Sequence, residues 1–244
     1  MKKYYYDFHI HSCLSPCGDD DNTPNNIAGM AMLMGLNIVA LTDHNSCKNC
    51  PAFFEAANRY GITPLAGMEL TTAEDIHVVC LFENLEDAMR FDEFVDSKRV
   101  KIKNKVEIFG NQQIMDGQDN IVGEDEFLLT NATNIFLDEV PDLVKQYGGI
   151  SFPAHIDKQA NGIIATLGTF PETADFNIIE INRKENIDKY IEKYSLSDKI
   201  LLINSDAHLL TTMREHENYL ELETESDSDE AIRHSLFDFL RNTK

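Results

Sequence analysis

The chain has 244 residues, which one large α/β domain is enough to explain, and its 43% hydrophobic and 26% charged residues exclude a disordered or fibrous protein. With 21 Lys and Arg against 42 Asp and Glu, the formal net charge is -21. A chain this acidic should repel a phosphate backbone, so we expect no long nucleic acid among its partners.

β-type and helical segments alternate along the chain. A strand at 4–10 is followed by a helix that begins at Thr23-Pro24 and ends at Gly35, a strand at 37–42, a helix at 51–60, and strands at 62–70 and 77–82. A helix at 85–100 leads into a polar segment, 101–130, which has a turn signal at 115–118 and is predicted to be an inserted hairpin or lid.

The alternation then resumes. It predicts a helix that ends near Gly148, strands at 150–155 and 176–181, a helix at 187–194, strands at 200–204 and 219–222, and a last helix at 229–240. Strands that alternate with helices over this length predict one α/β domain spanning 1–244, with a parallel sheet closed into a barrel or a distorted barrel.

No stretch approaches the roughly 20 apolar residues of a membrane span, so no membrane partner is expected. Asp7, His9 and His11 stand where a signal peptide needs an apolar core, which favours a cytoplasmic location. The sequence leaves the oligomeric state open.

Histidines and carboxylates gather at the predicted strand ends. His9 and His11 close the first strand two residues apart, and side chains at that spacing point to one face and can reach one ion. Similar positions at or near strand ends hold Asp43, His44, Glu69, His77, His155, Asp206 and His208. A single histidine on an apolar strand is more often a core residue than a ligand. Because barrel cores prefer branched apolar side chains, the whole set predicts a metal site where the strand ends converge.

Five short segments resemble the motifs of the PHP (polymerase and histidinol phosphatase) superfamily: DFHIHS (7–12), LTDHN (41–45), GME (67–69), PAH (153–155) and SDAH (205–208). They occur in order and cover nearly the full chain. The resemblance implies a distorted (β/α)7 TIM-like barrel, with the insertion near 101–130, and a stand-alone phosphoesterase with a three-metal site.

The resemblance also implies a set of metal ligands. His9 and His11 would hold a first ion with Glu69 and Asp206, and Glu69 would bridge to a second ion held by His77 and His155. A third ion would take His44, His208 and a residue of the first loop. That loop is longer here than the common pattern, and counting back from Thr23-Pro24 favours Asp19 over Asp20 as the ligand.

This donor set suits two to three divalent ions of Zn, Mn or Fe. A carboxylate that bridges two ions lets them share a water of lowered pKa, and the resulting metal-bound hydroxide can attack phosphorus without a side-chain nucleophile. Glu69, Asp206 and His208 are therefore the candidate catalytic residues. Asp43 is expected to fix a ligand imidazole rather than to bind metal.

Two cations are predicted near the barrel mouth. Lys158 follows His155 by three residues and Arg183 follows the strand ending at Ile181, so either could bind the substrate phosphate, although each could equally be an ordinary surface cation.

The cysteines Cys13, Cys17, Cys47 and Cys50 follow the first two strands and could hold another zinc ion, but reduced, partly buried thiols are the better interpretation. An odd total of five cysteines argues against a disulfide framework.

The predicted activity is hydrolysis of a small phosphorylated metabolite, with a nucleotide such as a nucleoside monophosphate or 3',5'-bisphosphate as the favoured substrate. Histidinol-phosphate hydrolysis is the alternative within the family. An amidohydrolase-type enzyme would want a bridging lysine where this chain has Glu69, and a non-catalytic metal-binding module would need lost ligands.

Overall fold

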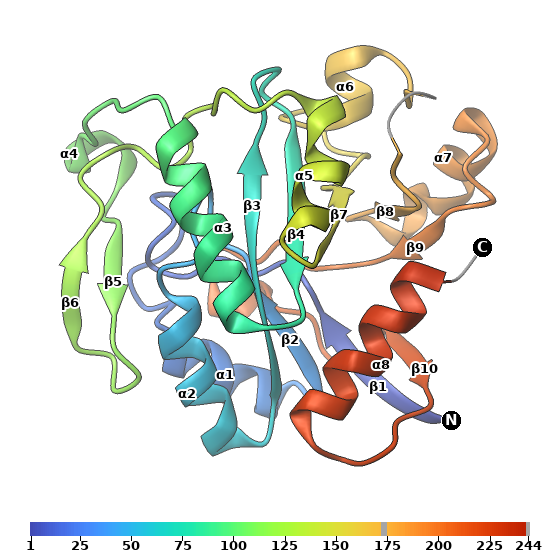
Figure 1. Cartoon of the computed structure of the whole chain (residues 1–244), viewed down its shortest axis with the longest axis horizontal. Helices are drawn as coiled ribbons and strands as arrows, with labels where there is room; N and C mark the ends of the chain where they lie inside the picture. The colour runs from blue at the N-terminus through green and yellow to red at the C-terminus, as the bar shows by residue number, and fades with distance from the viewer. Residues whose placement is uncertain (172–174, 243–244) are drawn as a thin grey trace.

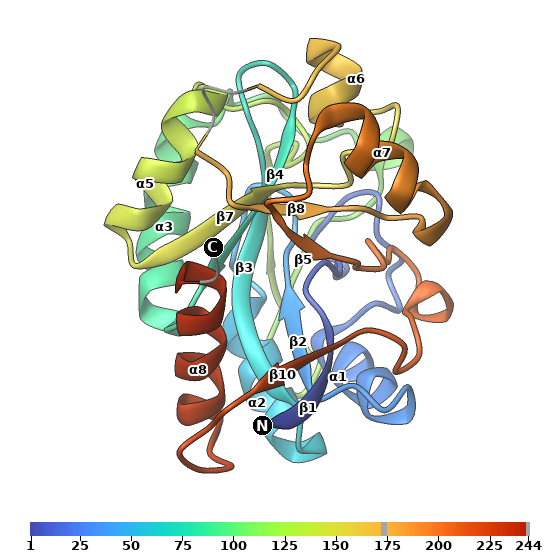
Figure 2. The same cartoon turned by 90° about the vertical axis from the view of Figure 1, so that its right-hand side faces the viewer.

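A six-stranded mixed sheet forms the centre of the molecule. The structure is a computed structural model that describes residues 1–171 and 175–242. The strand order is β10 (Tyr219–Leu222), β1 (Lys2–Asp7), β2 (Ile38–Leu41), β3 (Thr63–Thr71), β4 (His77–Phe82) and β7 (Gly149–Pro153). A separate parallel pair, β8 (Ile178–Glu180) and β9 (Ile200–Leu202), continues the curl beyond β7. Figure 2 shows the curl, because β7 runs across the view while β3 runs along it.

The curled α/β architecture confirms the predicted fold class, but the prediction of a parallel sheet was wrong. β1, β2 and β3 pair in parallel, whereas β3 with β4, β4 with β7 and β1 with β10 pair antiparallel. Only residues 72–76 separate β3 from β4. A parallel crossover needs about a dozen residues or more, so this connection can only form a hairpin. The number of seven β/α units stays a prediction.

Helices cover one face of the sheet. α1 (Pro24–Leu33), α2 (Cys50–Tyr60), α3 (Leu85–Lys98) and α5 (Val140–Gln146) share one apolar cluster with Ala66, Met68 and Leu70 of β3. As predicted, Thr23 caps α1, with its hydroxyl accepting the N–H of Asn26, and Gly61 ends α2 in the left-handed conformation at φ 67°.

The other face of the sheet has its own apolar cluster. Leu65 of β3, Val79 of β4 and Phe237 of α8 (Asp229–Asn242) belong to it, and Figure 1 shows α8 beside β1 and β10 near the chain's N-terminus. Because side chains alternate along a strand, Glu69 and His77 point to this same face, at the ends of β3 and β4 opposite to α8. The apolar cluster therefore supports the part of the sheet that carries those two side chains.

The insertion contains the predicted hairpin, β5 (Gln113–Met115) and β6 (Ile121–Glu124), preceded by the short helix α4 (Val106–Phe109). It lies at one edge of the molecule (Figure 1) and is attached to the first loop. The N–H of Gln113 donates to the carbonyl of Cys13, and the amide of Asn111 donates to the carboxylate of Asp20. Gly110, at φ 93°, lies so near the Pro16 carbonyl that a Cβ would come within 2.5 Å of that oxygen. The insertion thus holds the first loop in place.

The remaining described elements are short. They are α6 (Ile163–Leu167), α7 (Ile187–Tyr194) and three single 3-10 turns at Leu137–Glu139, Lys184–Asn186 and Leu210–Thr212. Among the described residues, we find no helix with the length and apolarity needed to cross a bilayer.

Candidate metal centre

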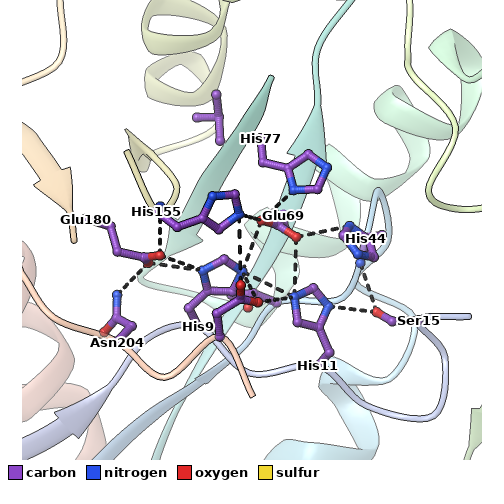
Figure 3. Close-up of polar contacts among 12 residues, drawn as sticks. His9, His11, Ser15, His44, Glu69, His77, His155, Glu180 and Asn204 are labelled. Carbon is purple, nitrogen blue, oxygen red and sulfur yellow. Dashed lines mark hydrogen bonds and ion pairs between the residues drawn. The ribbon is translucent and has the colours of Figure 1, made fainter. Parts of the chain in front are cut away.

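Glu69 lies at the centre of a buried group of imidazoles (Figure 3). Its Oε1 is 2.8 Å from Nδ1 of His77, 3.1 Å from Nε2 of His155 and 3.2 Å from Nε2 of His9. Its Oε2 is 3.0 Å from Nδ1 of His44 and 3.3 Å from Nε2 of His11. The two carboxylate oxygens therefore face different sets of nitrogens, as a carboxylate that bridges two ions must.

Asp206 is the second carboxylate of the group. Its Oδ1 lies 3.3 Å from Nε2 of His11 and 3.5 Å from Nε2 of His9, and the donor atoms of these three residues could hold one ion. Two further groups among the described residues have donor atoms close enough to share an ion: His44 with Glu69 and His77, and His11 with His44 and His208. These three groups overlap, because His11 and His44 each belong to two of them.

The backbone brings these side chains together from distant strand ends. Nε2 of His9 and Nε2 of His11 lie 3.2 Å apart, as their two-residue spacing predicts. His155 (φ 27°), two residues after β7, and Asp206 (φ 52°), four residues after β9, adopt left-handed backbone conformations. Such conformations are unfavourable for residues other than glycine and concentrate at functional sites.

Glu180 supports His9 from β8, and the sequence alone does not show which way its side chain points. Its carboxylate is fully buried, lies 3.1 Å from Nδ1 of His9 and accepts the backbone N–H of His155 at 2.9 Å, while the amide of Asn204 donates to it at 2.8 Å. The only sign of this role in the sequence was a glutamate in an otherwise apolar strand. Because the carboxylate accepts the Nδ1 proton, Nε2 of His9 is left free to bind an ion.

Asp43 orients an imidazole indirectly, through Ser15. The Ser15 hydroxyl donates to Asp43 Oδ1 at 2.7 Å and lies 2.9 Å from Nδ1 of His11. The hydroxyl proton goes to the carboxylate, so the hydroxyl oxygen accepts from His11 Nδ1 and directs Nε2 of that ring toward Glu69. The partner role predicted for Asp43 remains a prediction, and this contact supports it for His11 rather than for the adjacent His44.

Burial and the charges of neighbouring side chains determine which imidazoles of the group are protonated. Burial alone would lower the pKa of His11, but the Asp206 and Glu69 carboxylates outweigh it and raise that pKa to about 9. Burial lowers the pKa of His208 to about 4, and the nearby His11 adds to this effect. Burial also holds the pKa of His44 well below its ordinary value. His44 and His208 are therefore neutral and ready to bind an ion, whereas His11 must release a proton first.

The residues present fit divalent ions. In the part of the chain that the structure describes, buried Asp206 Oδ1 and His44 Nδ1 have no hydrogen-bond partner, although a buried polar atom ordinarily has one. Imidazole nitrogens combined with carboxylate oxygens are the donors that Zn, Mn and Fe prefer. An ion at this position would satisfy atoms that the protein leaves unpaired.

Three predicted site residues lie outside the buried group of imidazoles and carboxylates or at its edge. Asp19 is exposed and its carboxylate belongs to none of the groups of candidate ligands, although its backbone N–H donates to the carbonyl of His208 at 3.0 Å. The ammonium of Lys158 pairs with Oδ2 of Asp206 at the edge of the group. Arg183 is exposed, and its backbone N–H donates to the Asp157 carboxylate. The roles predicted for these residues stay predictions.

The cysteines do not join the site. Cys47 and Cys50 are buried with Sγ directed at the Gly67 carbonyl, and Cys13 is buried beside Gln113. No cysteine occurs in the groups of candidate ligands found among residues 1–171 and 175–242. Their thiols are free, as expected.

The sequence model of the PHP domain matches residues 7–221. The match covers most of the chain, which therefore belongs to the PHP family. Within this domain, its buried histidines and carboxylates form groups that could hold a metal ion. No curated protein sequence matches it.

Solved structures of similar fold include a lesion-specific endonuclease, Endonuclease Q from Pyrococcus furiosus, with a TM-score of 0.64 and 18% identity. The similarity covers 95% of this chain but 55% of that one, so our chain spans just over half of the endonuclease. A candidate metal-dependent phosphoesterase from Bifidobacterium adolescentis gives 0.59 and 18%, covering 95% of both chains. An amidohydrolase from Chromobacterium violaceum gives 0.55 and 17%, covering 90% and 92%.

The expectation that excluded long nucleic acid was wrong. The structure of Endonuclease Q with a 27-mer duplex substrate matches all of this chain with a TM-score of 0.61 and 16% identity. A fold of this kind therefore can act on duplex DNA. Net charge averages over the whole surface, whereas a site that collects metal cations can be locally attractive to phosphate.

Proposed function

We propose that this protein hydrolyses a phosphate ester of a nucleotide with two or three divalent ions held by the histidines and carboxylates described above. The observation that carries the proposal is the position of Glu69, whose two oxygens face separate groups of imidazoles. Ions bound on either side of such a carboxylate would supply an activated water and would neutralise the charge of the phosphoryl oxygens.

The chain's own residues would orient these groups and bind the substrate. Glu180 and Ser15 hold the Nδ1 atoms of His9 and His11, which keeps each Nε2 directed at the centre. His208 places Nδ1 3.0 Å from the Asp206 carbonyl, so its proton lies there and Nε2 stays unprotonated. Lys158, 39% exposed at its side chain, can leave Asp206 and pair with the phosphate of an incoming substrate.

A phosphodiester within nucleic acid is the second candidate substrate. The fold similarity to Endonuclease Q in complex with duplex DNA supports this candidate. Histidinol phosphate remains the family alternative, and the same ions would serve it.

The test is phosphate release from AMP, adenosine 3',5'-bisphosphate and histidinol phosphate, beside cleavage of an oligonucleotide duplex with an abasic site. Each substrate is assayed with Mn or Zn and then with a chelator. Chelator-sensitive release from the nucleotides would support the proposal, and release from histidinol phosphate alone would replace the substrate class. Absence of turnover on all four, in protein shown to contain metal, would contradict it.

A further inference from the structure

Asn45 directly follows the candidate ligand His44 in the loop after β2. It contacts both the end of β3 and the segment by which the chain leaves the insertion, residues 129–133, which we call the insertion exit. The residue is 1% exposed, and its backbone has a left-handed φ of 48°, which asparagine adopts more readily than most residues. A buried amide needs partners for its polar atoms, and those of Asn45 come from two different parts of the chain.

The backbone of Asn45 continues the pairing of β2 with β3 past the end of β2. The carbonyl of Asp43 accepts the N–H of Glu69 at 3.0 Å, and the carbonyl of Glu69 accepts the N–H of Asn45 at 3.0 Å. His44 and Glu69 form a parallel bridge between these two bonds, and Nδ1 of His44 lies 3.0 Å from Oε2 of Glu69. The backbone on either side of His44 thus fixes the position of Glu69.

The amide oxygen of Asn45 extends this contact along β3. It accepts the N–H of Thr71, two residues after Glu69, at 2.8 Å. Asn45 therefore binds β3 at two points, the Glu69 carbonyl and the Thr71 N–H. The loop that carries His44 cannot slide along the strand without breaking both bonds.

The amide nitrogen of Asn45 faces the insertion exit. It donates to the carbonyl of Leu129 at 2.7 Å and to that of Asn131 at 3.0 Å. Carbonyl oxygens only accept, so both protons of the NH2 group are used and the orientation of the amide is fixed. Leu129 is fully buried, and a buried carbonyl that loses its donor is costly to leave unpaired. One amide thus joins the insertion exit to the strand end that carries Glu69.

The insertion exit also pairs with β3 directly. The carbonyl of Thr71 accepts the N–H of Thr133 at 3.0 Å and the Thr133 hydroxyl at 2.8 Å, and Thr133 is buried. Thr71 is therefore held by Asn45 through its N–H and by the insertion exit through its carbonyl. Because close-packed interiors transmit a displacement rather than absorb it, a shift of the insertion exit would move Thr71 and, two residues away, Glu69.

We propose that Asn45 is a positioning residue that couples the insertion to the metal centre. It acts through the backbone of His44 and Glu69 and not by binding an ion itself. The inference goes beyond the proposed function, because it holds whatever ester is hydrolysed, and it rests on that function only for the binding of metal. Coupling of this kind is reciprocal: ions held by His44 and Glu69 would steady the insertion exit, and loosening the exit would weaken the binding of the ions.

The variant Asn45→Asp separates the two contacts of the side chain. Aspartate has nearly the same shape and tolerates a left-handed φ, and its carboxylate can still accept the N–H of Thr71. It has no N–H for the carbonyls of Leu129 and Asn131. We expect its affinity for Mn or Zn, measured by competition with a chromophoric chelator, to fall by about tenfold, the lower end of the range for partners that orient ligands. The added negative charge alone would strengthen the binding of a cation, so it cannot produce this loss.

A neutral variant and a matched control complete the comparison. Asn45→Gly keeps the left-handed φ without strain and lacks the amide, so it should lose at least as much affinity. Asn104→Asp adds the same charge within the insertion and removes a 2.8 Å bond from the amide to the Gly110 carbonyl, but none to the metal centre, so its affinity should be that of the wild type. Circular dichroism checks that each variant is folded. Wild-type affinity in either Asn45 variant, or an equal loss in Asn104→Asp, overturns the coupling.

Hydrogen exchange tests the coupling in the opposite direction and needs no turnover. Metal loading of the wild type should slow amide exchange in the insertion exit by about tenfold more than in α8, which packs at the other end of the sheet. In Asn45→Asp this additional protection should disappear. A purely structural role of Asn45 would change exchange equally with and without metal, and that result overturns the proposal.

The same samples separate this inference from the proposed function. If the wild type binds metal but hydrolyses no phosphate ester, the proposed function fails, while the affinities and the exchange rates still decide the coupling. If the wild type hydrolyses an ester and the Asn45 variants bind metal as it does, the coupling fails alone. A wild type that binds neither Mn nor Zn overturns both.

Discussion

Glu180 holds His9 in place. Both oxygens of the Glu180 carboxylate lie 3.1 Å from Nδ1 of His9, and both side chains are fully buried. Burial alone would raise the pKa of Glu180, but the neighbouring His9 lowers it below its ordinary value, so the carboxylate is ionised at neutral pH. An ionised acceptor makes the imidazole a stronger ligand through its other nitrogen.

Replacing Glu180 with Gln should therefore weaken metal binding without removing a ligand. We expect a decrease of about 10–100-fold in metal affinity, the usual effect of losing a partner of this kind. Competition with a chromophoric chelator measures the affinity. Glu185→Gln, a substitution of an exposed glutamate, is the control and should leave the affinity as it is. Equal affinities in Glu180→Gln and the wild type would mean that His9 needs no such partner.

Glu69→Gln tests the bridging position itself. An amide has one oxygen and one nitrogen, so it cannot present an anionic oxygen to both groups of imidazoles. We expect the folded variant to bind less metal and to lose turnover by at least a thousandfold, an order of magnitude in line with removing a transition-state contact. Metal content by elemental analysis, circular dichroism and phosphate release are measured together. Exposed Glu93→Gln serves as the control. Full activity in Glu69→Gln would show that the bridge is misassigned.

Metal removal should destabilise the protein as well as inactivate it. The ions would bind the folded centre and not the unfolded chain, so at a free-metal concentration 100 times Kd they add about 2.7 kcal/mol to the free energy of unfolding. Thermal unfolding with chelator, and then with a series of Mn or Zn concentrations, gives the dependence. A Tm that does not change with metal concentration would contradict a folded-state metal site.

The sequence predicted most elements because their limits are set by local chemistry. Thr23 and Pro24 begin α1, and Gly61 ends α2. The turn signal at 115–118 lies where β5 ends and the chain turns back to form β6. The gathering of His9, His11 and Glu69 was predictable too, since strand ends meet at one edge of a curled sheet.

Other features depend on tertiary contacts that a linear pattern does not encode. The indirect link of Asp43 to His11 passes through Ser15, whose hydroxyl the sequence offered as one of many in a loop. The ion pair of Lys158 with Asp206 requires the loop after β7 to lie beside the loop after β9. Net charge was a poor guide to partners because it carries no information on where the charges lie.

A final prediction concerns the anchor of the insertion. The Asp125 carboxylate accepts two hydrogen bonds from the guanidinium of Arg99, at 2.9 and 3.0 Å, and one from Lys48 at 2.6 Å. Burial alone would raise the pKa of Asp125, but these cations lower it from 3.8 to about 2. The folded pKa is thus below the unfolded one, so the stabilisation is fully present above about pH 4 and is lost as the pH falls toward 2.

Asp125→Asn should therefore lower the free energy of unfolding at pH 7 by about 2 kcal/mol, with solvent screening taken into account. The difference between variant and wild type should become smaller at pH 3, where the wild-type carboxylate begins to take up its proton. Urea unfolding at both pH values, in chelator so that metal release does not contribute, measures the two differences. The buried Arg99 guanidinium loses its anionic partner in the variant, so the variant should be less stable than the wild type at neutral pH. A difference that is the same at pH 7 and pH 3 would show that the ionised form of Asp125 does not stabilise the insertion.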